Sequence, residues 1–183
     1  MYKRQIQLLA EEMKISDLIV KVILNRGIDT SSLARIYLNP NEEILHPPLA
    51  EFPDLYKSIS LLTRAIKEKS KIAICGDYDA DGMTSTSLLL RALKYFGGDI
   101  HYKIPDRIKD GYGINTQIVE NLAKNGVELI LTVDNGISAY DPIQRAVELG
   151  VNVIITDHHD IPKKLPPADA ILNPKLLSHE SPY

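Results

Sequence analysis

Three aspartates stand at alternate positions in one short stretch between two apolar runs. Asp77, Asp79 and Asp81 lie in GDYDADG, and MTSTS follows at residues 83–87. Carboxylates held close together repel one another, which raises their pKa values and costs stability unless positive charge or hydrogen-bond donors compensate. A divalent cation supplies that charge and keeps neighbouring carboxylates ionised. Taken alone, however, an aspartate-rich loop after a strand is more often a solvated turn that caps the next helix.

Two further polar clusters strengthen the metal interpretation. Asp134 lies in VDNG at 133–136, and Asp157, His158 and His159 lie in TDHH at 156–159. Aspartate oxygens with one or two imidazoles form a hard ligand field that suits Mn²⁺ or Mg²⁺ and suits copper or structural zinc poorly. A bridging carboxylate can hold two ions ~3.5–4 Å apart, which activate water and bind phosphoryl oxygens. The clusters therefore predict phosphoester or phosphoanhydride hydrolysis.

The elements that must position these side chains alternate between short apolar runs and amphipathic segments after residue 70. We expect strands at 71–75, 100–104, 129–133 and 151–156, and helices at 84–96, after an Asn115 cap, and from Asp141-Pro142. This alternation predicts an α/β fold, a mainly parallel sheet with helices on both faces. The predicted buried stripe of the 84–96 helix is Leu88, Leu89, Ala92, Leu93 and Phe96.

The polar clusters follow the first, third and fourth predicted strands. All three therefore lie at carboxyl ends of strands, although some eighty positions separate them. In open parallel sheets the crevice outside the carboxyl ends is where ligands bind. We expect the three clusters to meet there in a single site.

The first 69 residues have a helical pattern broken by prolines. Ser16, Ser31 or Ser32, and Asp54 are the expected helix starts. We expect this helical segment to precede the α/β part of the chain.

Composition limits the class of protein. The chain has 183 residues, 44% of them apolar, and a formal net charge of −3, so it can bury one core and lacks the basic excess typical of nucleic-acid binders. No apolar run approaches the ~20 residues of a membrane span, and the start MYKRQIQLLAEEMK lacks a signal-peptide pattern. Cys75, the single cysteine, excludes an internal disulfide and fits a reducing compartment. We therefore expect a cytoplasmic protein with no membrane partner.

The motifs resemble a known family. GDYDADG with TST, VDNG and TDHH are similar to the first three motifs of the DHH phosphoesterase superfamily. Within it, PDRIKDGYG at 105–113 and the leader ILNRGI…YLNP at 23–40 resemble the RecJ family of single-strand-specific exonucleases. The resemblance covers nearly the whole chain in the right order. It implies a helical segment at 1–69 and a Rossmann-like DHH domain at 70–183, ending before the family's fourth acidic motif and its C-terminal DHHA1-type domain.

The resemblance also implies roles for the metal-binding side chains. Asp79, Asp81 and His158 match metal ligands, and Asp134 matches the aspartate that bridges both ions. Asp77 is a further candidate ligand, because this chain has Cys75 where several relatives have a metal-binding histidine, and thiolate is a soft ligand. We expect the metals to be two Mn²⁺ or Mg²⁺ ions. The expected catalytic residues are Asp134, His158 and His159.

The substrate-binding roles come from the same resemblance. His159 matches a histidine that faces the scissile phosphate, and Asp157 matches a residue that holds an imidazole in place. Arg107 and Tyr112 match positions that meet the DNA 5′ phosphate and a nucleotide, which suits a guanidinium fork and a stacking ring. Ser85 lies near a predicted helix N-terminus, which favours a phosphate nearby.

The implied function is a metal-dependent exonuclease that runs 5′→3′ on single-stranded DNA, in DNA repair and recombination. Its implied partners are single-stranded DNA, a single-stranded-DNA-binding protein and a helicase. One alternative is a small-substrate DHH phosphoesterase acting on oligoribonucleotides, pyrophosphate or cyclic dinucleotides. Another is an inactive DHH-fold fragment or scaffold. A receiver-like phosphoacceptor domain would explain acidic strand ends but not the paired histidines.

Overall fold

The computed structural model describes residues 2–39, 47–178 and 181. Its contacts divide the chain into two compact units, Met1–Leu45 and His46–Tyr183. Helix α5 (Leu55–Glu68) thus groups with the larger unit by its contacts, although it lies in the segment 1–69 that the sequence pattern sets apart. The domain division into 1–69 and 70–183 stays a prediction.

The described residues of the smaller unit form three helices, α1 (Tyr2–Met13), α2 (Asp17–Leu24) and α3 (Ser31–Leu38). Ser16 caps α2 as expected, since its hydroxyl accepts a hydrogen bond from Ile19 N at 3.4 Å. The expected cap of α3 at Ser31 or Ser32 is wrong. Thr30 has the extended backbone that a capping residue needs, and its hydroxyl accepts from Leu33 N at 3.3 Å. Pro40, the end of the leader motif, lies outside the described residues.

The larger unit is built on a five-stranded sheet in which every neighbouring pair is parallel. Its order is β2-β1-β3-β4-β5. The bounds are β1 Lys71–Cys75, β2 Asp99–Lys103, β3 Val127–Val133, β4 Asn152–Thr156 and β5 Ala170–Leu172. The predicted α/β class and the first four strands are confirmed. The short edge strand β5 was not predicted.

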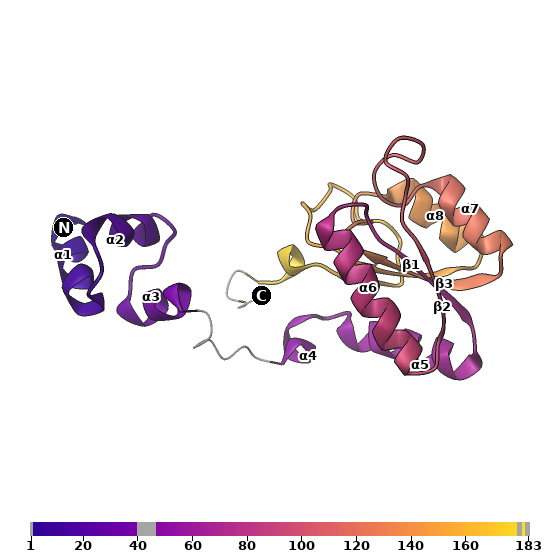
Figure 1. The fold of residues 1–183 in the computed structure, drawn as a ribbon, viewed down its shortest axis with the longest axis horizontal. Helices are drawn as coiled ribbons and strands as arrows, with labels where there is room; N and C mark the ends of the chain where they lie inside the picture. Colours follow the sequence, from indigo (N-terminus) through magenta and orange to yellow (C-terminus); the bar gives the residue numbers. More distant parts are fainter. Residues whose placement is uncertain (1, 40–46, 179–180, 182–183) are drawn as a thin grey trace. The chain divides into compact units, whose positions relative to one another are not determined.

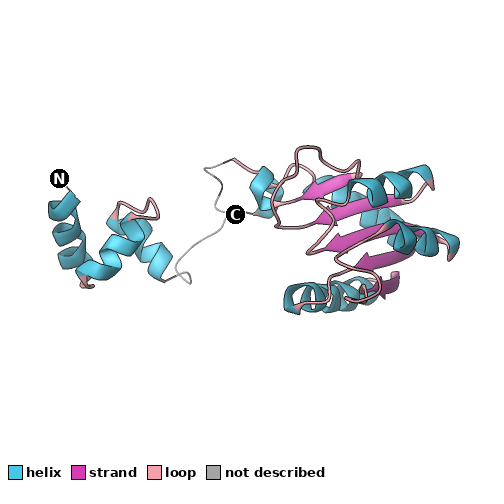
Figure 2. Ribbon diagram, turned by 90° about the horizontal axis from the view of Figure 1, so that it is seen from above, coloured by secondary structure: helices cyan, strands magenta, loops and turns pink. Residues whose placement is uncertain are grey.

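Helices cover both faces of the sheet (Figures 1 and 2). Helices α5 and α6 (Ala80–Tyr95) pack on one face, around Ile72 and Ile74 of β1. Helices α7 (Thr116–Lys124) and α8 (Tyr140–Glu148) pack on the other, around Ala73 and Cys75. Alternate residues of each central strand therefore enter opposite halves of the core. Two short elements, α4 (Pro48–Glu51) and the 3-10 turn η2 (Pro174–Leu176), complete the unit.

Helix α6 differs from the expectation in its start and in its buried face. It begins at Ala80, four residues before the predicted Thr84. Leu93 is buried and Leu89 is packed against the core, but Leu88 is 70% exposed and Phe96 is 66% exposed. Leu88 and Leu93 are five positions apart, which places them about 140° apart around an α-helix. Phe96 is the residue after the last helical turn.

Two other helix starts differ in detail from the sequence pattern. Asp54 precedes α5, but its carboxylate makes no capping hydrogen bond. It accepts instead from Ile171 N at 2.9 Å, so it ties α5 to the edge strand β5. Helix α8 begins at Tyr140, and Asp141 lies in its first turn. Among the described residues, no helix is both long enough and apolar enough to cross a bilayer.

Candidate metal centre

The turn after β1 places its three aspartates in different surroundings. Asp77 is buried, and its Oδ1 has no hydrogen-bond partner among the described residues. Asp79 is the N-cap of α6, where one oxygen accepts from Gly82 N at 3.0 Å. Gly82 lets the first turn of α6 approach the backbone of Asp77 closely. A Cβ at this position would lie 2.5 Å from Asp77 N. Asp81 follows in the first turn of α6, exposed to solvent.

Asp134 directly follows β3 and lies in the left-handed region, with φ of 60°. Its N–H donates to Thr156 O at 3.0 Å, which joins the ends of β3 and β4. Its Oδ1 lies 2.9 Å from His158 Nε2, and its carboxyl group lies near enough to that of Asp79 for the two charges to interact. Burial and the nearby charge of Asp79 raise the pKa of Asp134 above its ordinary value. The site thus holds two adjacent carboxyl groups whose repulsion a cation would relieve.

Asp157 accepts hydrogen bonds from the backbone of His158 and His159 and contacts the His159 ring. Its Oδ1 accepts from the backbone N–H of His158 at 2.7 Å and lies 2.7 Å from His159 Nδ1, while its Oδ2 accepts from Ile137 N at 2.9 Å. Burial alone would raise the pKa of Asp157, but these hydrogen bonds bring it below its ordinary value. The bond to Asp157 also raises the pKa of His159. Asp157 is therefore an anionic acceptor that fixes where His159 points.

Tyr112 reaches the same site from the loop between β2 and α7. Its hydroxyl lies 3.2 Å from Asp134 O, to which it donates, and 3.3 Å from His159 Nε2. Burial, then the charges of Asp77, Asp157 and other site carboxylates, raise the pKa of Tyr112 to about 12. The phenol therefore stays protonated in neutral solution.

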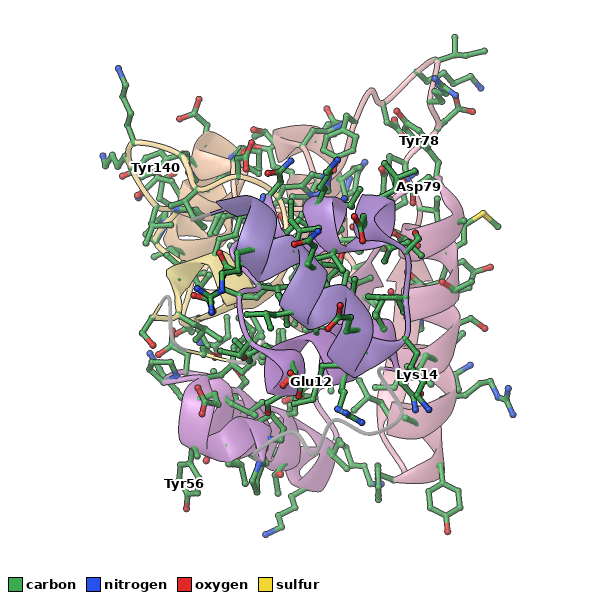
Figure 3. The ribbon with its side chains drawn as sticks, turned by 90° about the vertical axis from the view of Figure 1, so that its left-hand side faces the viewer. Glu12, Lys14, Tyr56, Tyr78, Asp79 and Tyr140 are labelled. Atoms are coloured by element: carbon green, nitrogen blue, oxygen red, sulfur yellow. The ribbon has the colours of Figure 1, made fainter. Side chains whose placement is uncertain are left out.

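The rest of that loop is held by its own hydrogen bonds. Asp110 accepts from Lys103 Nζ at 3.0 Å and from Asp106 N at 2.9 Å, which fastens the loop to the end of β2. Arg107 is exposed, and its guanidinium carbon lies 5.3 Å from the centre of the Tyr78 ring. Tyr78 lies at the upper end of the larger unit as drawn in Figure 3.

Two hollows flank the Asp134–His158 pair. One, of about 470 Å³, lies against α6, and its lining includes Asp81, Ser85 and Leu88. The other, of about 330 Å³, lies between Tyr112, His159 and the start of α8. Asp134 and His158 line the first hollow, and Asp157 lines both. Arg107 lines neither hollow.

The predicted residues lie at one edge of the sheet, but only some of them lie close enough together to share an ion. Asp134, His158 and His159 offer ligand atoms that all lie within 4.8 Å of one another, the arrangement expected for a shared ion. Asp79 lies near enough for its charge to act on Asp134, and Asp81 and Ser85 line the hollow against α6 together with Asp134 and His158. Asp77 is near enough for its charge to act on Tyr112. The individual roles assigned to these side chains stay predictions.

The sequence pattern missed two buried asparagines that support the site. Asn135 donates to Cys75 O at 3.0 Å and to Val133 O at 2.9 Å, and it accepts from Ile114 N at 3.2 Å. Asn173 donates to His159 O at 3.0 Å. Asn135 directly follows Asp134, so its place in VDNG was the available signal. Nothing local to Asn173 marks it, because its partner lies fourteen residues away.

The donor set has the chemistry of a site for a hard divalent cation. It combines carboxylate oxygens with imidazole nitrogens, which Mn²⁺ and Mg²⁺ accept. The unpartnered Asp77 oxygen and the adjacent carboxyl groups of Asp79 and Asp134 are costs that a cation would offset. Cys75 is a poor candidate ligand, since burial raises the pKa of its thiol to about 12.

Comparisons with known proteins find similar sequences for most of the chain. Residues 71–181 match the model of the DHH family, N-terminal domain. The chain is 39% identical over 179 residues to the single-stranded-DNA-specific exonuclease RecJ of Bacillus subtilis, covering 98% of this chain and 23% of that protein. It is 42% identical over 130 residues to RecJ of Escherichia coli, covering 70% of this chain and 22% of that protein.

Solved structures of RecJ proteins share the fold. A crystal structure of exonuclease RecJ bound to manganese superposes with a TM-score of 0.66 at 37% identity, covering 73% of this chain and 33% of that one. RecJ from Thermus thermophilus in complex with Mn²⁺ gives a TM-score of 0.70 at 29% identity, covering 96% of this chain and 24% of that one. The chain thus spans about a quarter of the length of the curated relatives it matches. Because the DHH model covers more than half of its 183 residues and includes all three acidic clusters, the chain belongs to the DHH family.

Proposed function

We propose that the protein hydrolyses phosphodiester bonds of single-stranded DNA from the 5′ end, as a metal-dependent exonuclease in DNA repair and recombination. The observation that carries the proposal is the cluster of Asp134, His158 and His159, whose ligand atoms all lie within 4.8 Å of one another. The names of the RecJ relatives supply the substrate and the reaction class. The strand polarity comes from family resemblance.

The residues that would hold two Mn²⁺ or Mg²⁺ ions are Asp77, Asp79, Asp81, Asp134 and His158. The RecJ structures with Mn²⁺ and with Mg²⁺ support this choice of ion. When bound, divalent ions activate a water and neutralise charge on the phosphoryl oxygens. Asp134 would be the shared ligand, a proposal supported by its closeness to His158 and by the charge that Asp79 exerts on it.

The other site residues are proposed to orient the DNA. His159 is held by Asp157 and has a raised pKa, so it can donate a charge-assisted hydrogen bond to the scissile phosphate. Tyr112, held near His159, offers a ring on which a base can stack. Arg107 is proposed to meet the 5′ phosphate, and Ser85 to meet a phosphate within the hollow against α6.

The wider setting belongs to the same proposal. A cytoplasmic location agrees with the single, buried cysteine. A single-stranded-DNA-binding protein and a helicase are proposed partners by family resemblance alone.

A nuclease assay tests the function. With Mn²⁺, we expect mononucleotides to be released from 5′-phosphorylated single strands, with duplex spared. Asp134→Ala should abolish release, because it removes the bridging carboxylate. Asp134→Asn should do the same, and it is the cleaner variant because asparagine tolerates a φ of 60°.

The control is Asp99→Asn, which removes an exposed carboxylate at the amino end of β2, and it should leave the rate unchanged. Equal turnover of pyrophosphate and DNA would replace the proposal with the small-substrate alternative. Retained activity in Asp134→Asn would refute the assigned metal centre.

A further inference from the structure

Four side chains form a continuous row from the exposed loop to the metal centre. The Arg107 guanidinium lies 5.3 Å from the centre of the Tyr78 ring, the Tyr78 and Tyr112 rings lie 6.4 Å apart, and the Tyr112 and His159 rings lie 6.0 Å apart. Both ring pairs meet edge to face, at interplanar angles of 85° and 81°. These are the distances and orientations of favourable aromatic contacts.

Tyr78 is the one side chain of this row to which the proposed function gives no role. It lies between Asp77 and Asp79, yet it lines neither of the two hollows beside the metal centre. Its hydroxyl makes no hydrogen bond within the part of the chain that the structure describes. What the side chain offers is its half-buried ring, which contacts Arg107 on one side and Tyr112 on the other.

The contact with the Tyr78 ring is the one that can position Arg107 among the described residues. It is exposed and forms no ion pair among the described residues, so no carboxylate fixes its guanidinium. A cation above an aromatic face is attracted by the ring, and the guanidinium's N–H donors stay available to a phosphate at its edge. Long arginine side chains otherwise lose rotamer freedom on binding, which weakens affinity.

We propose that Tyr78 is a positioning residue that sets the preference for a 5′-phosphorylated DNA end. It holds the guanidinium of Arg107 and the ring of Tyr112 in fixed relation to each other and to His159. The terminal phosphate and the first base are then recognised at a set distance from the bond to be cut. This inference rests on the proposed function, since it presumes a single-stranded DNA substrate.

The test compares binding of two oligothymidylates, one with a 5′ phosphate and one with a 5′ hydroxyl, by fluorescence anisotropy with metal omitted to prevent turnover. The wild type should prefer the phosphorylated end. Tyr78→Phe keeps the ring and should keep that preference. Tyr78→Ala should reduce the preference about fivefold, the typical scale of one cation–π contact.

Two further measurements separate positioning from damage to the neighbouring aspartates. Mn²⁺ affinity by calorimetry should be the same in Tyr78→Ala and the wild type. In a double-mutant cycle, Tyr78→Ala should add nothing to the lost preference of Arg107→Ala, because Tyr78 acts through that arginine.

The outcomes distinguish this inference from the proposed function. An unchanged preference in Tyr78→Ala, an equal loss in Tyr78→Phe, or a parallel loss of Mn²⁺ affinity would overturn the role of Tyr78 while leaving the nuclease proposal intact. A wild type that binds DNA without regard to its 5′ end would also overturn it. A wild type that binds neither oligonucleotide would contradict both proposals.

Discussion

Asp134 shows how a single backbone conformation can arrange a site. Its φ of 60° is uncommon for a residue other than glycine, and aspartate is among the few that tolerate it. In that conformation its N–H bonds to Thr156 and its carboxyl group faces Asp79 and His158. The sequence could predict an aspartate at the end of a strand. It could not predict the left-handed turn, because that depends on contacts with β4.

The contact between Asp157 and His159 should set the pKa of the His159 imidazole. Asp157 raises the pKa of His159 in the metal-free protein, so Asp157→Asn should bring that pKa down toward the ordinary value of about 6.5. An NMR titration of the imidazole measures the change. The wild type serves as the reference, and an unchanged His159 pKa in Asp157→Asn would contradict the assigned contact.

The Asp157–His159 pair should also make the stability of the fold depend on pH. The folded-state pKa of His159 is raised. Its contribution to the free energy of unfolding is therefore full below about pH 6.5 and is lost as pH rises through the folded-state pKa. Because the pKa of Asp157 is lowered, its contribution is present above about pH 3.9 and is lost as pH falls through the folded-state pKa. The two contributions therefore overlap in mildly acidic solution.

At the scale of elements, the hydrophobic pattern predicted most of the sheet, and what it missed was set by tertiary contacts. Strand β5 has only three residues, and its backbone is held from outside by Asp54. Leu88 fits a helical stripe by spacing, yet it faces the hollow against α6 because α6 turns Leu93 to the core. Periodicity shows which residues share a face, whereas neighbouring elements decide which face is covered.

Asn135 joins three elements, and its loss should be costly. Its amide bonds to the ends of β1 and β3 and to the segment before α7, all in the buried interior. Asn135→Ala leaves those backbone groups unpaired and should lower the free energy of unfolding by about 2–4 kcal/mol. Urea unfolding measures this value.

The control for Asn135 is Asn121→Ala, which changes an exposed asparagine on α7. It should alter the free energy of unfolding by no more than about 0.5 kcal/mol. Equal losses in the two variants would show that Asn135 does not join the strand ends in the way its hydrogen bonds indicate.

At the scale of the whole molecule, all the candidate site residues lie in the larger unit. That unit has its own core on both faces of the sheet, whereas the smaller unit packs around Ile6, Leu9 and Val20. The sequence predicted the helical leader and the α/β part. The contacts group α5 with the larger unit, because α5 packs on β5, a contact that its leader-like helical pattern could not show.

Residues 46–183 should therefore fold without the smaller unit. We expect this shortened chain to unfold cooperatively and to bind Mn²⁺ with the affinity of the full chain, because the described strands and the clustered Asp134, His158 and His159 all lie in the larger unit. Thermal unfolding by circular dichroism and titration calorimetry measure the two properties. A shortened chain that is unfolded, or folded but unable to bind Mn²⁺, would contradict this independence.

The central claim is that carboxylates and imidazoles from three strand ends share divalent ions. A crystal of the protein soaked in Mn²⁺ tests it directly, through the anomalous scattering of manganese. Two peaks should appear roughly 3.5–4 Å apart, with the Asp134 carboxylate between them and His158 beside one. An anomalous map with no peak within coordination distance of Asp134 would contradict it.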